Sequence, residues 1–220
     1  TFIGLSRGGE RNTPHDMVAT VLTGDSSMLS AIISTRNSER SLVPTLSALV
    51  PAAAAGLLAE VVIADASSHD ATADVADIAG CRFTSSTEAL GLRLKAAAAT
   101  VRSPWVMFLR AGAVPQPGWI EAADHFIQTT GLLEDAGRAA IFRPPGLTNA
   151  VRPGFAELLA VVRAAIARGP RPEQGLLIAR RLYDAIGGHS AGDDAEAAIL
   201  RRLGRQRLVV LPASITIPNI

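Results

Sequence analysis

Polar residues that can bind a ligand or move a proton are concentrated in three clusters in the first half of the chain. The clusters are residues 34–39, residues 65–70 and residues 110–113, and each one directly follows a run of apolar residues. They contain hydroxyl, amide, carboxylate and guanidinium groups, which hydrogen-bond polar ligands and bind ions. We therefore expect a site for a polar or charged ligand, provided that the fold brings the clusters together.

The elements expected around these clusters alternate between strands and helices. Short apolar runs predict strands, and apolar residues spaced by three or four predict helices. Strands are expected at residues 29–34, 60–64, 82–84 and 105–109, and helices at residues 41–49, 72–78 and 89–101. This order indicates a single α/β domain with a mainly parallel sheet and helices on both faces. The carboxyl ends of parallel strands lie at one edge of a sheet, so the three clusters should lie together there. Such sheets bind their ligands at this edge.

The second half of the chain is less regular, and it is expected to complete the same domain. Helices are expected at residues 120–129, 155–167, 181–186 and 193–203, and strands at residues 139–143, 175–179 and 208–211. The amphipathic helix at 155–167 is expected to pack on the core, with a partner or a membrane surface as alternatives. We expect a flexible N-terminal extension at residues 1–27, the domain at residues 28–212, and a C-terminal tail at residues 213–220.

Composition and missing motifs argue against several classes of protein. The formal net charge is only +1, without long charge runs, which argues against a nucleic-acid partner. Cys81 is the only cysteine, which excludes a disulfide framework and a thiolate zinc site within one chain. No run of about 18 apolar residues occurs, so we expect a cytoplasmic protein with at most peripheral membrane contact.

Three common catalytic motifs are also missing from the sequence. No G-x-G-x-x-G follows the first strand, and no G-x-x-x-x-G-K-[ST] or G-x-S-x-G occurs. These absences argue against a Rossmann dehydrogenase, a P-loop nucleotidase and an α/β-hydrolase.

Five segments, in the same order along the chain, resemble the glycosyltransferases of family 2. They read AIISTRNSE at 31–39, EVVIADASSHDAT at 60–72, WVMFL and PQPGW at 105–119, EQGLLIARR at 173–181, and DDAE and RRLGR at 193–205. The resemblance implies a GT-A fold, which is Rossmann-like, with a nucleotide-binding half at residues 28–113 and an acceptor-binding half at residues 114–212. It also implies transfer of a sugar from a nucleotide-diphosphate sugar to an acceptor, which could be a saccharide, a lipid or a small metabolite.

Roles for individual residues are expected from the resemblance and, for Arg93, Lys95 and Arg110, from their place near the strand end at which the sequence departs from the family. Donor binding is expected from Ser34, Thr35, Arg36, Asn37, Glu39, Asp65, Asp70, Arg93, Lys95, Arg110 and Gly112. Glu173 and Gln174 are expected on the acceptor side, and Asp193 or Asp194 is expected to be the general base. Each carboxylate has a structural alternative, since Asp65 and Asp70 could cap a helix and Asp193 and Asp194 could be an exposed helix start.

The sequence departs from the family at the end of the strand expected at 105–109. Family members usually hold a divalent Mg or Mn ion there with an Asp-x-Asp motif, but this chain has Arg110, Ala111 and Gly112. Ala66 also replaces the Asp that usually recognises the nucleotide base. We therefore expect no metal cofactor.

Two hypotheses follow from this departure. Arg110 could supply the missing positive charge, because a guanidinium can bind a diphosphate through two hydrogen bonds, and Arg93 and Lys95 could assist it. Alternatively, the chain is an inactive pseudo-glycosyltransferase that serves as a binding or assembly module. The exchange of Asp for Arg, and not for a small residue, favours the enzyme.

Overall fold

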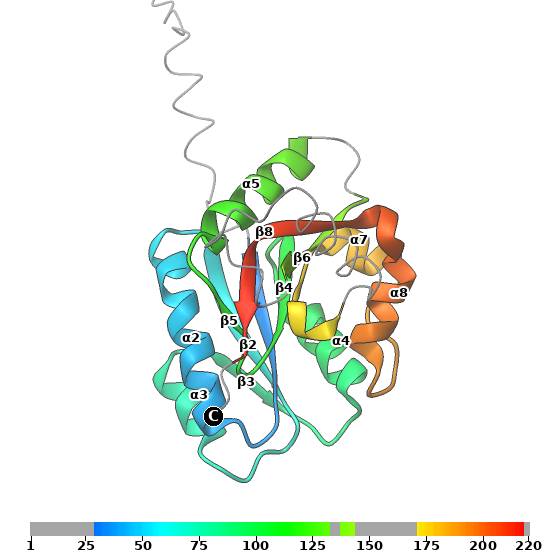
Figure 1. The fold of residues 1–220 in the computed structure, drawn as a ribbon. Helices are drawn as coiled ribbons and strands as arrows, with labels where there is room; N and C mark the ends of the chain where they lie inside the picture. The colour runs from blue at the N-terminus through cyan, green and yellow to red at the C-terminus, as the bar shows by residue number, and fades with distance from the viewer. Residues whose placement is uncertain (1–28, 133–136, 144–170, 218–220) are drawn as a thin grey trace, which may run out of the picture.

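The computed structural model describes residues 29–132, 137–143 and 171–217 (Figure 1). The N-terminal extension expected at 1–27 and the amphipathic helix expected at 155–167 lie outside these ranges.

The first half of the chain alternates strictly between strands and helices, as its apolar pattern predicts. The elements are β1 (Leu29–Thr35), α2 (Glu39–Ala54), β2 (Leu58–Asp65), α3 (Thr72–Ile78), β3 (Arg82–Ser85), α4 (Leu90–Thr100) and β4 (Trp105–Arg110). Strands β1 to β4 pair in parallel, in the order β3-β2-β1-β4. Helices α2 and α4 lie on opposite sides of these strands (Figure 1).

The second half extends the same sheet. Its elements are β5 (Val114–Pro115), α5 (Trp119–Leu132), β6 (Ala139–Arg143), the 3₁₀ turn η1 (Pro172–Gln174), β7 (Leu176–Ala179), α7 (Arg180–Ala185), α8 (Ala195–Arg207) and β8 (Leu208–Thr216). Strand β7 pairs antiparallel with β4, and the sheet continues in the order β7-β6-β8-β5. The expected single α/β domain with a mainly parallel sheet is therefore confirmed.

The last strand is longer than its sequence pattern predicts. Residues 213–216, expected in a C-terminal tail, belong to β8, so that expectation was wrong for these positions. Ala213 and Ile215 are buried, and Ile215 and Thr216 pair with β5. The pairing with β5 and the burial of alternate residues keep the chain extended beyond Leu211.

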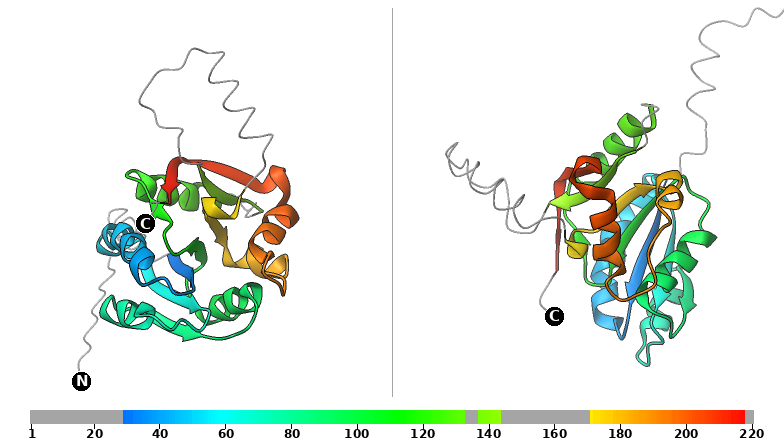
Figure 2. Two further views of the ribbon diagram at one scale, coloured as in Figure 1. Left: turned by 60° about the horizontal axis from the view of Figure 1, so that its bottom comes forward. Right: turned by 90° about the vertical axis from the view of Figure 1, so that its right-hand side faces the viewer.

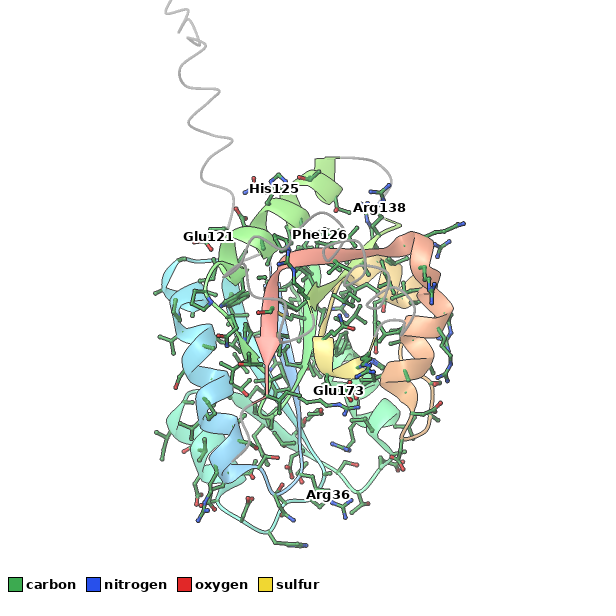
Figure 3. All side chains as sticks on the ribbon, in the orientation of Figure 1. Arg36, Glu121, His125, Phe126, Arg138 and Glu173 are labelled. Atoms are coloured by element: carbon green, nitrogen blue, oxygen red, sulfur yellow. The ribbon has the colours of Figure 1, made fainter. Side chains whose placement is uncertain are left out.

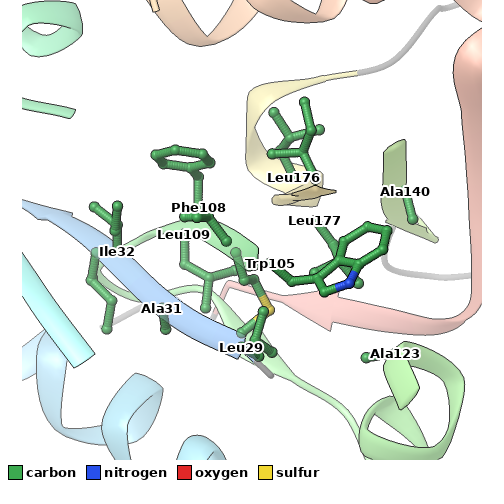
Figure 4. Close-up of a cluster of buried hydrophobic side chains, with 14 of the residues drawn as sticks. Leu29, Ala31, Ile32, Trp105, Phe108, Leu109, Ala123, Ala140, Leu176 and Leu177 are labelled. Atoms are coloured by element: carbon green, nitrogen blue, oxygen red, sulfur yellow. The ribbon is translucent and has the colours of Figure 1, made fainter. Parts of the chain in front are cut away.

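One continuous hydrophobic core joins the two halves of the chain. Figure 4 shows Trp105 and Phe108 of β4 in one cluster with Leu29 of β1 and with Leu176 and Leu177 of β7. Trp105 of β4 also packs edge to face on Phe126 of α5. Because β4 is covered by side chains from both halves, the end of β4 is held in a fixed place relative to α8 and η1.

Within the described ranges of the chain, no helix has the length and apolar character needed to cross a membrane.

Candidate functional site

The three polar clusters of the sequence meet at one edge of the sheet. Thr35 is in register with Asp65, and Ser34 is in register with Arg110. Figure 3 shows Arg36 and Glu173 toward this end of the molecule, with Glu121 and His125 of α5 at the opposite end. In the left view of Figure 2 this edge has come forward. The parallel strands thus place the clusters together, as expected.

Asp65 is buried at the end of β2 and organises this edge. Its two oxygens accept hydrogen bonds from the hydroxyls of Thr35, Ser68 and Ser85 and from the backbone N–H of Ser68. Burial alone would raise the pKa of Asp65, but these hydrogen bonds outweigh burial and lower its pKa. In this structure Asp65 and Thr35 therefore fix the strand ends and the loop after β2.

The loops that follow β1 and β2 are tied together by polar contacts. Asp70 accepts hydrogen bonds from the backbone N–H of Glu39, at the start of α2, and of Thr72, at the start of α3. Asn37, which has a φ of 47°, accepts a hydrogen bond from the backbone N–H of His69. The Thr72 hydroxyl bonds to Asp70 and is the main cause of its lowered pKa. The capping alternative for Asp70 thus describes its geometry here.

Two basic residues expected in the site have different positions on α4. Arg93 donates hydrogen bonds to the carbonyl of Ala64 at 2.6 Å and to the carbonyl of Glu88 at 3.0 Å, which places its guanidinium beside the end of β2. Lys95 is exposed and leaves the helix about 200° further round. Burial lowers the pKa of Arg93, with the charges of Asp65 and Asp193 opposing it. Of the two, only Arg93 joins the strand edge.

The turn after β4 is pinned against α2. Ala111 donates a hydrogen bond to the carbonyl of Ser34, and the N–H of Gly112 contacts both the carbonyl of Ser41 and the hydroxyl of Thr45. Gly112 has a φ of +90°, and a Cβ there would lie 3.6 Å from the Cβ of Ser41. The backbone of Gly112 thus serves the turn, and Arg110 is the residue of this cluster whose side chain reaches the acceptor half.

Arg110 lies between two carboxylates. Its Nε donates to Oε2 of Glu196 at 2.6 Å, its Nη2 contacts the same oxygen, and its Nη1 lies 3.6 Å from Oε1 of Glu173. Burial would lower the pKa of Arg110, but the hydrogen bond and charge of Glu196, with the charge of Glu173, raise it overall. The guanidinium is therefore permanently charged and partly neutralised by its neighbours.

Glu196 was missed as a site residue by the sequence analysis, although a signal for it exists. It lies on the buried stripe of α8, together with Ile199, Leu200 and Leu203. A carboxylate at helical spacing within an apolar stripe needs a buried partner, because an unpaired buried charge is costly. The partner is Arg110, which comes from a different half of the chain.

The two aspartates expected to act as the base make different contacts in this structure. Oδ1 of Asp193 accepts a hydrogen bond of 3.4 Å from the backbone N–H of Leu90, at the start of α4. Oδ2 of Asp194 lies 2.8 Å from Nη2 of Arg201, in an exposed pair on α8. Asp193 thus stays at the strand edge near Arg93, whereas Asp194 faces solvent.

The two residues expected on the acceptor side also differ. Gln174 is buried, and its side chain donates to the carbonyl of Phe142 and accepts from the N–H of Arg171. Glu173 is exposed and faces Arg110. Gln174 therefore fixes the turn η1, and Glu173 is the member of the pair that reaches the strand edge.

The fold and this edge define an α/β protein whose polar strand-end residues lie together beside arginine side chains. The family comparison makes the class specific: the chain belongs to Glycosyl transferase family 2, whose model matches residues 30–190. No curated protein matches the sequence.

Solved structures with a similar fold are available from Mycobacterium tuberculosis. Glucosyl-3-phosphoglycerate synthase in complex with Mn2+, UDP and glucosyl-3-phosphoglycerate is 19% identical, with 99% of this chain and 79% of that chain covered and a TM-score of 0.63. The same enzyme with Mg2+ and UDP is 18% identical, with 98% and 78% covered and a TM-score of 0.63. The expected family and GT-A fold are therefore confirmed.

The residues at the end of β4 do not fit the divalent ion that the family implies. A guanidinium has no lone pair to offer a cation and repels it, and the two nearest carboxylates already contact Arg110. Within residues 29–132, 137–143 and 171–217, no group of three His, Cys, Asp or Glu residues is placed to hold a metal.

Proposed function

We propose that this chain transfers a glycosyl group from a nucleoside-diphosphate sugar, with uridine as the nucleoside, to a hydroxyl acceptor. The observation that carries the proposal is the guanidinium of Arg110 at the end of β4, in a family 2 fold. The similar synthase from Mycobacterium tuberculosis has been solved with UDP-glucose and phosphoglyceric acid. These names support a uridine nucleotide here and leave the acceptor open.

The reaction requires two groups from the protein. The acceptor oxygen forms a bond to the anomeric carbon while the bond from that carbon to the diphosphate breaks, and the diphosphate leaves with the electron pair. Arg110, assisted by Arg93, stabilises the charge that develops on the leaving oxygens, as a charged donor does in other transfer reactions. A carboxylate takes the proton of the acceptor hydroxyl. We propose no metal in this step.

The experiment is isothermal titration of the protein with UDP and with UDP-sugars, in EDTA and in Mn2+. We expect UDP to bind in EDTA, and Arg110→Ala to weaken binding by about 1.5–3 kcal/mol, the range for a hydrogen bond to a charged group. Arg102→Ala is the matched control, because Arg102 is exposed at the opposite end of β4. The Arg102→Ala variant should bind UDP with unchanged affinity.

Two results would contradict the proposal. If UDP binds only in the presence of Mn2+, Arg110 does not act without a metal. Absence of binding with every UDP-sugar would favour a binding or assembly module, a function that the existing pairing of Arg110 with its own glutamates also supports.

Asp194 is our candidate for the general base. Its pair with Arg201 is exposed, and exposed pairs contribute little to stability, so its carboxylate can be released for the acceptor at little cost. We expect Asp194→Asn to bind UDP as the unmodified chain does and to lose transfer of the sugar, measured as release of UDP with a panel of hydroxyl acceptors. A variant that still transfers sugar would exclude Asp194.

A further inference from the structure

The two glutamates that contact Arg110 differ in burial. The side chain of Glu196 is 9% exposed and contacts both Nε and Nη2, whereas that of Glu173 is 46% exposed and contacts Nη1 at 3.6 Å. The two carboxylates therefore face different edges of one guanidinium. This difference decides which of them can exchange with a ligand.

Separating Glu196 from Arg110 would cost the folded protein much of its stability. Glu196 lines a small cavity with the uncharged residues Phe108 and Leu200 and with His189, and among the described residues its ion pair is with Arg110. Breaking a buried ion pair leaves an uncompensated charge, which destabilises a protein strongly. Position 196 also lies in the first turn of α8, where the helix dipole favours a carboxylate. The contact of Glu196 with the Nε edge of Arg110 is therefore costly to break.

Glu173, by contrast, is fixed only at its backbone. Gly175 packs the turn η1 against β4, since a Cβ there would lie 2.9 Å from Cδ2 of Leu109, and Gln174 anchors the turn to β6. This keeps Glu173 opposite Nη1 of Arg110. Its long and exposed ion pair contributes little, so an anion that binds Nη1 can displace the carboxylate.

We propose that Glu196 is a positioning residue, which aims Arg110 at the diphosphate, and that Glu173 is a displaceable counter-ion, which occupies the guanidinium edge that the diphosphate takes. The inference rests on the proposed donor site. It assigns opposite effects to two residues of the same chemistry, because removing the anchor weakens anion binding and removing the competitor strengthens it.

The experiment compares two isosteric variants by titration with UDP in EDTA. We expect Glu196→Gln to raise the Kd about tenfold, the scale of one charged hydrogen bond, and Glu173→Gln to lower it about threefold. Glu196→Asp, which keeps the charge, should recover part of the lost affinity. Glu88→Gln is the matched control for a general charge effect, because Glu88 is exposed just before α4. The Kd of this variant for UDP should stay within about twofold of that of the unmodified chain.

Two further readouts do not depend on nucleotide binding. Glu196→Gln should lower the Tm by about 5 °C, and Glu173→Gln should leave it unchanged. Modification of Arg110 by phenylglyoxal, followed by peptide mass spectrometry, should be several times faster in Glu173→Gln than in the unmodified chain.

The outcomes separate this inference from the proposed function. Failure of the unmodified chain to bind UDP, with the expected Tm and modification rates, would refute the donor site and keep the roles of the two glutamates. If both glutamine variants shift the Kd in the same direction, or if Glu173→Gln leaves the modification rate of Arg110 unchanged, the assignment is wrong. An effect of Glu88→Gln as large as that of Glu173→Gln would also overturn it.

Discussion

At the scale of single residues, His189 is a buried group whose charge state the fold controls. It is 2% exposed, and its Nδ1 lies 2.9 Å from the hydroxyl of Tyr183. That hydroxyl accepts a hydrogen bond from the backbone N–H of His189, so its own proton is available for Nδ1. The geometry thus suits a neutral imidazole. Burial, and then the charge of Arg202, lower the pKa of His189 to about 4.

This lowered pKa predicts a loss of stability in mild acid. Between pH 6.5 and 4 the unfolded chain binds a proton that the folded chain does not, so stability falls as the pH falls. From the pKa shift, we expect the free energy of unfolding to fall by about 2 kcal/mol between pH 7 and pH 5. Urea denaturation at the two pH values measures this change.

The variant His189→Gln isolates the contribution of the imidazole. It keeps a side-chain group that can accept from the Tyr183 hydroxyl but does not titrate, so its stability should change little between pH 7 and pH 5. An equally steep loss in this variant would show that another group causes the acid sensitivity.

The site residues could be predicted from the sequence only where the strand pattern alone determines their position. Arg110 is the last residue of β4 and directly follows the apolar run 105–109, so its place at the sheet edge could be predicted. Glu196 needs a partner 86 positions away, and no local pattern predicts that contact. The multiple hydrogen bonds of Asp65 were also not predictable, because they depend on the register of β1 and β3 beside β2 and on the fold of the loop that carries Ser68.

At the scale of elements, the start of α4 and the loop before α8 are in unusually close contact. The N–H of Gly91 donates to the carbonyl of Gly192 at 3.1 Å, and Asp193 accepts from Leu90 beside it. A Cβ at Gly91 would lie 1.7 Å from the carbonyl oxygen of Ser190. Only glycine allows this approach, which also brings Arg93 and Asp193 to the same edge.

Gly91→Ala should therefore force α4 and this loop apart. We expect the free energy of unfolding to fall by about 1–3 kcal/mol, the usual cost of overpacking, as measured by urea denaturation. Gly131→Ala in α5 is the matched control, because no atom of the described part of the chain lies within 4 Å of a Cβ there. In a helix that change is expected to be neutral or stabilising by up to about 1 kcal/mol. Equal stability of the two variants would contradict the close contact.

The existence and order of the elements could be predicted from apolar spacing, since β1 to β4 and the helices between them occur where expected. Their boundaries were less accurate. Helix α2 begins at Glu39 and continues to Ala54, beyond the residues 41–49 expected, because alanines after Leu49 extend the helix. The contact of α4 with the loop before α8 was not predicted, because it joins backbone groups about a hundred residues apart.

At the scale of the whole molecule, the class of the fold was predictable, whereas the arrangement of its second half was not. Continuous apolar strands between helices indicate a covered parallel sheet in any order of strands. Neither the antiparallel β7 beside β4 nor the pairing of β8 with both β6 and β5 has a local signature. These pairings bring η1 and α8 to the end of β4, so the acceptor half of the site depends on contacts that sequence patterns do not encode.

The pairing of Arg110 with two glutamates also has a consequence for how such a site can change over generations. One guanidinium and two carboxylates together carry a net charge of minus one. A doubly charged cation held by those two glutamates and an aspartate at position 110 would carry the same net charge. A single exchange at that position would therefore conserve the local net charge, whereas the complete Asp-x-Asp motif of the family would also need a carboxylate at position 112, where this chain has glycine.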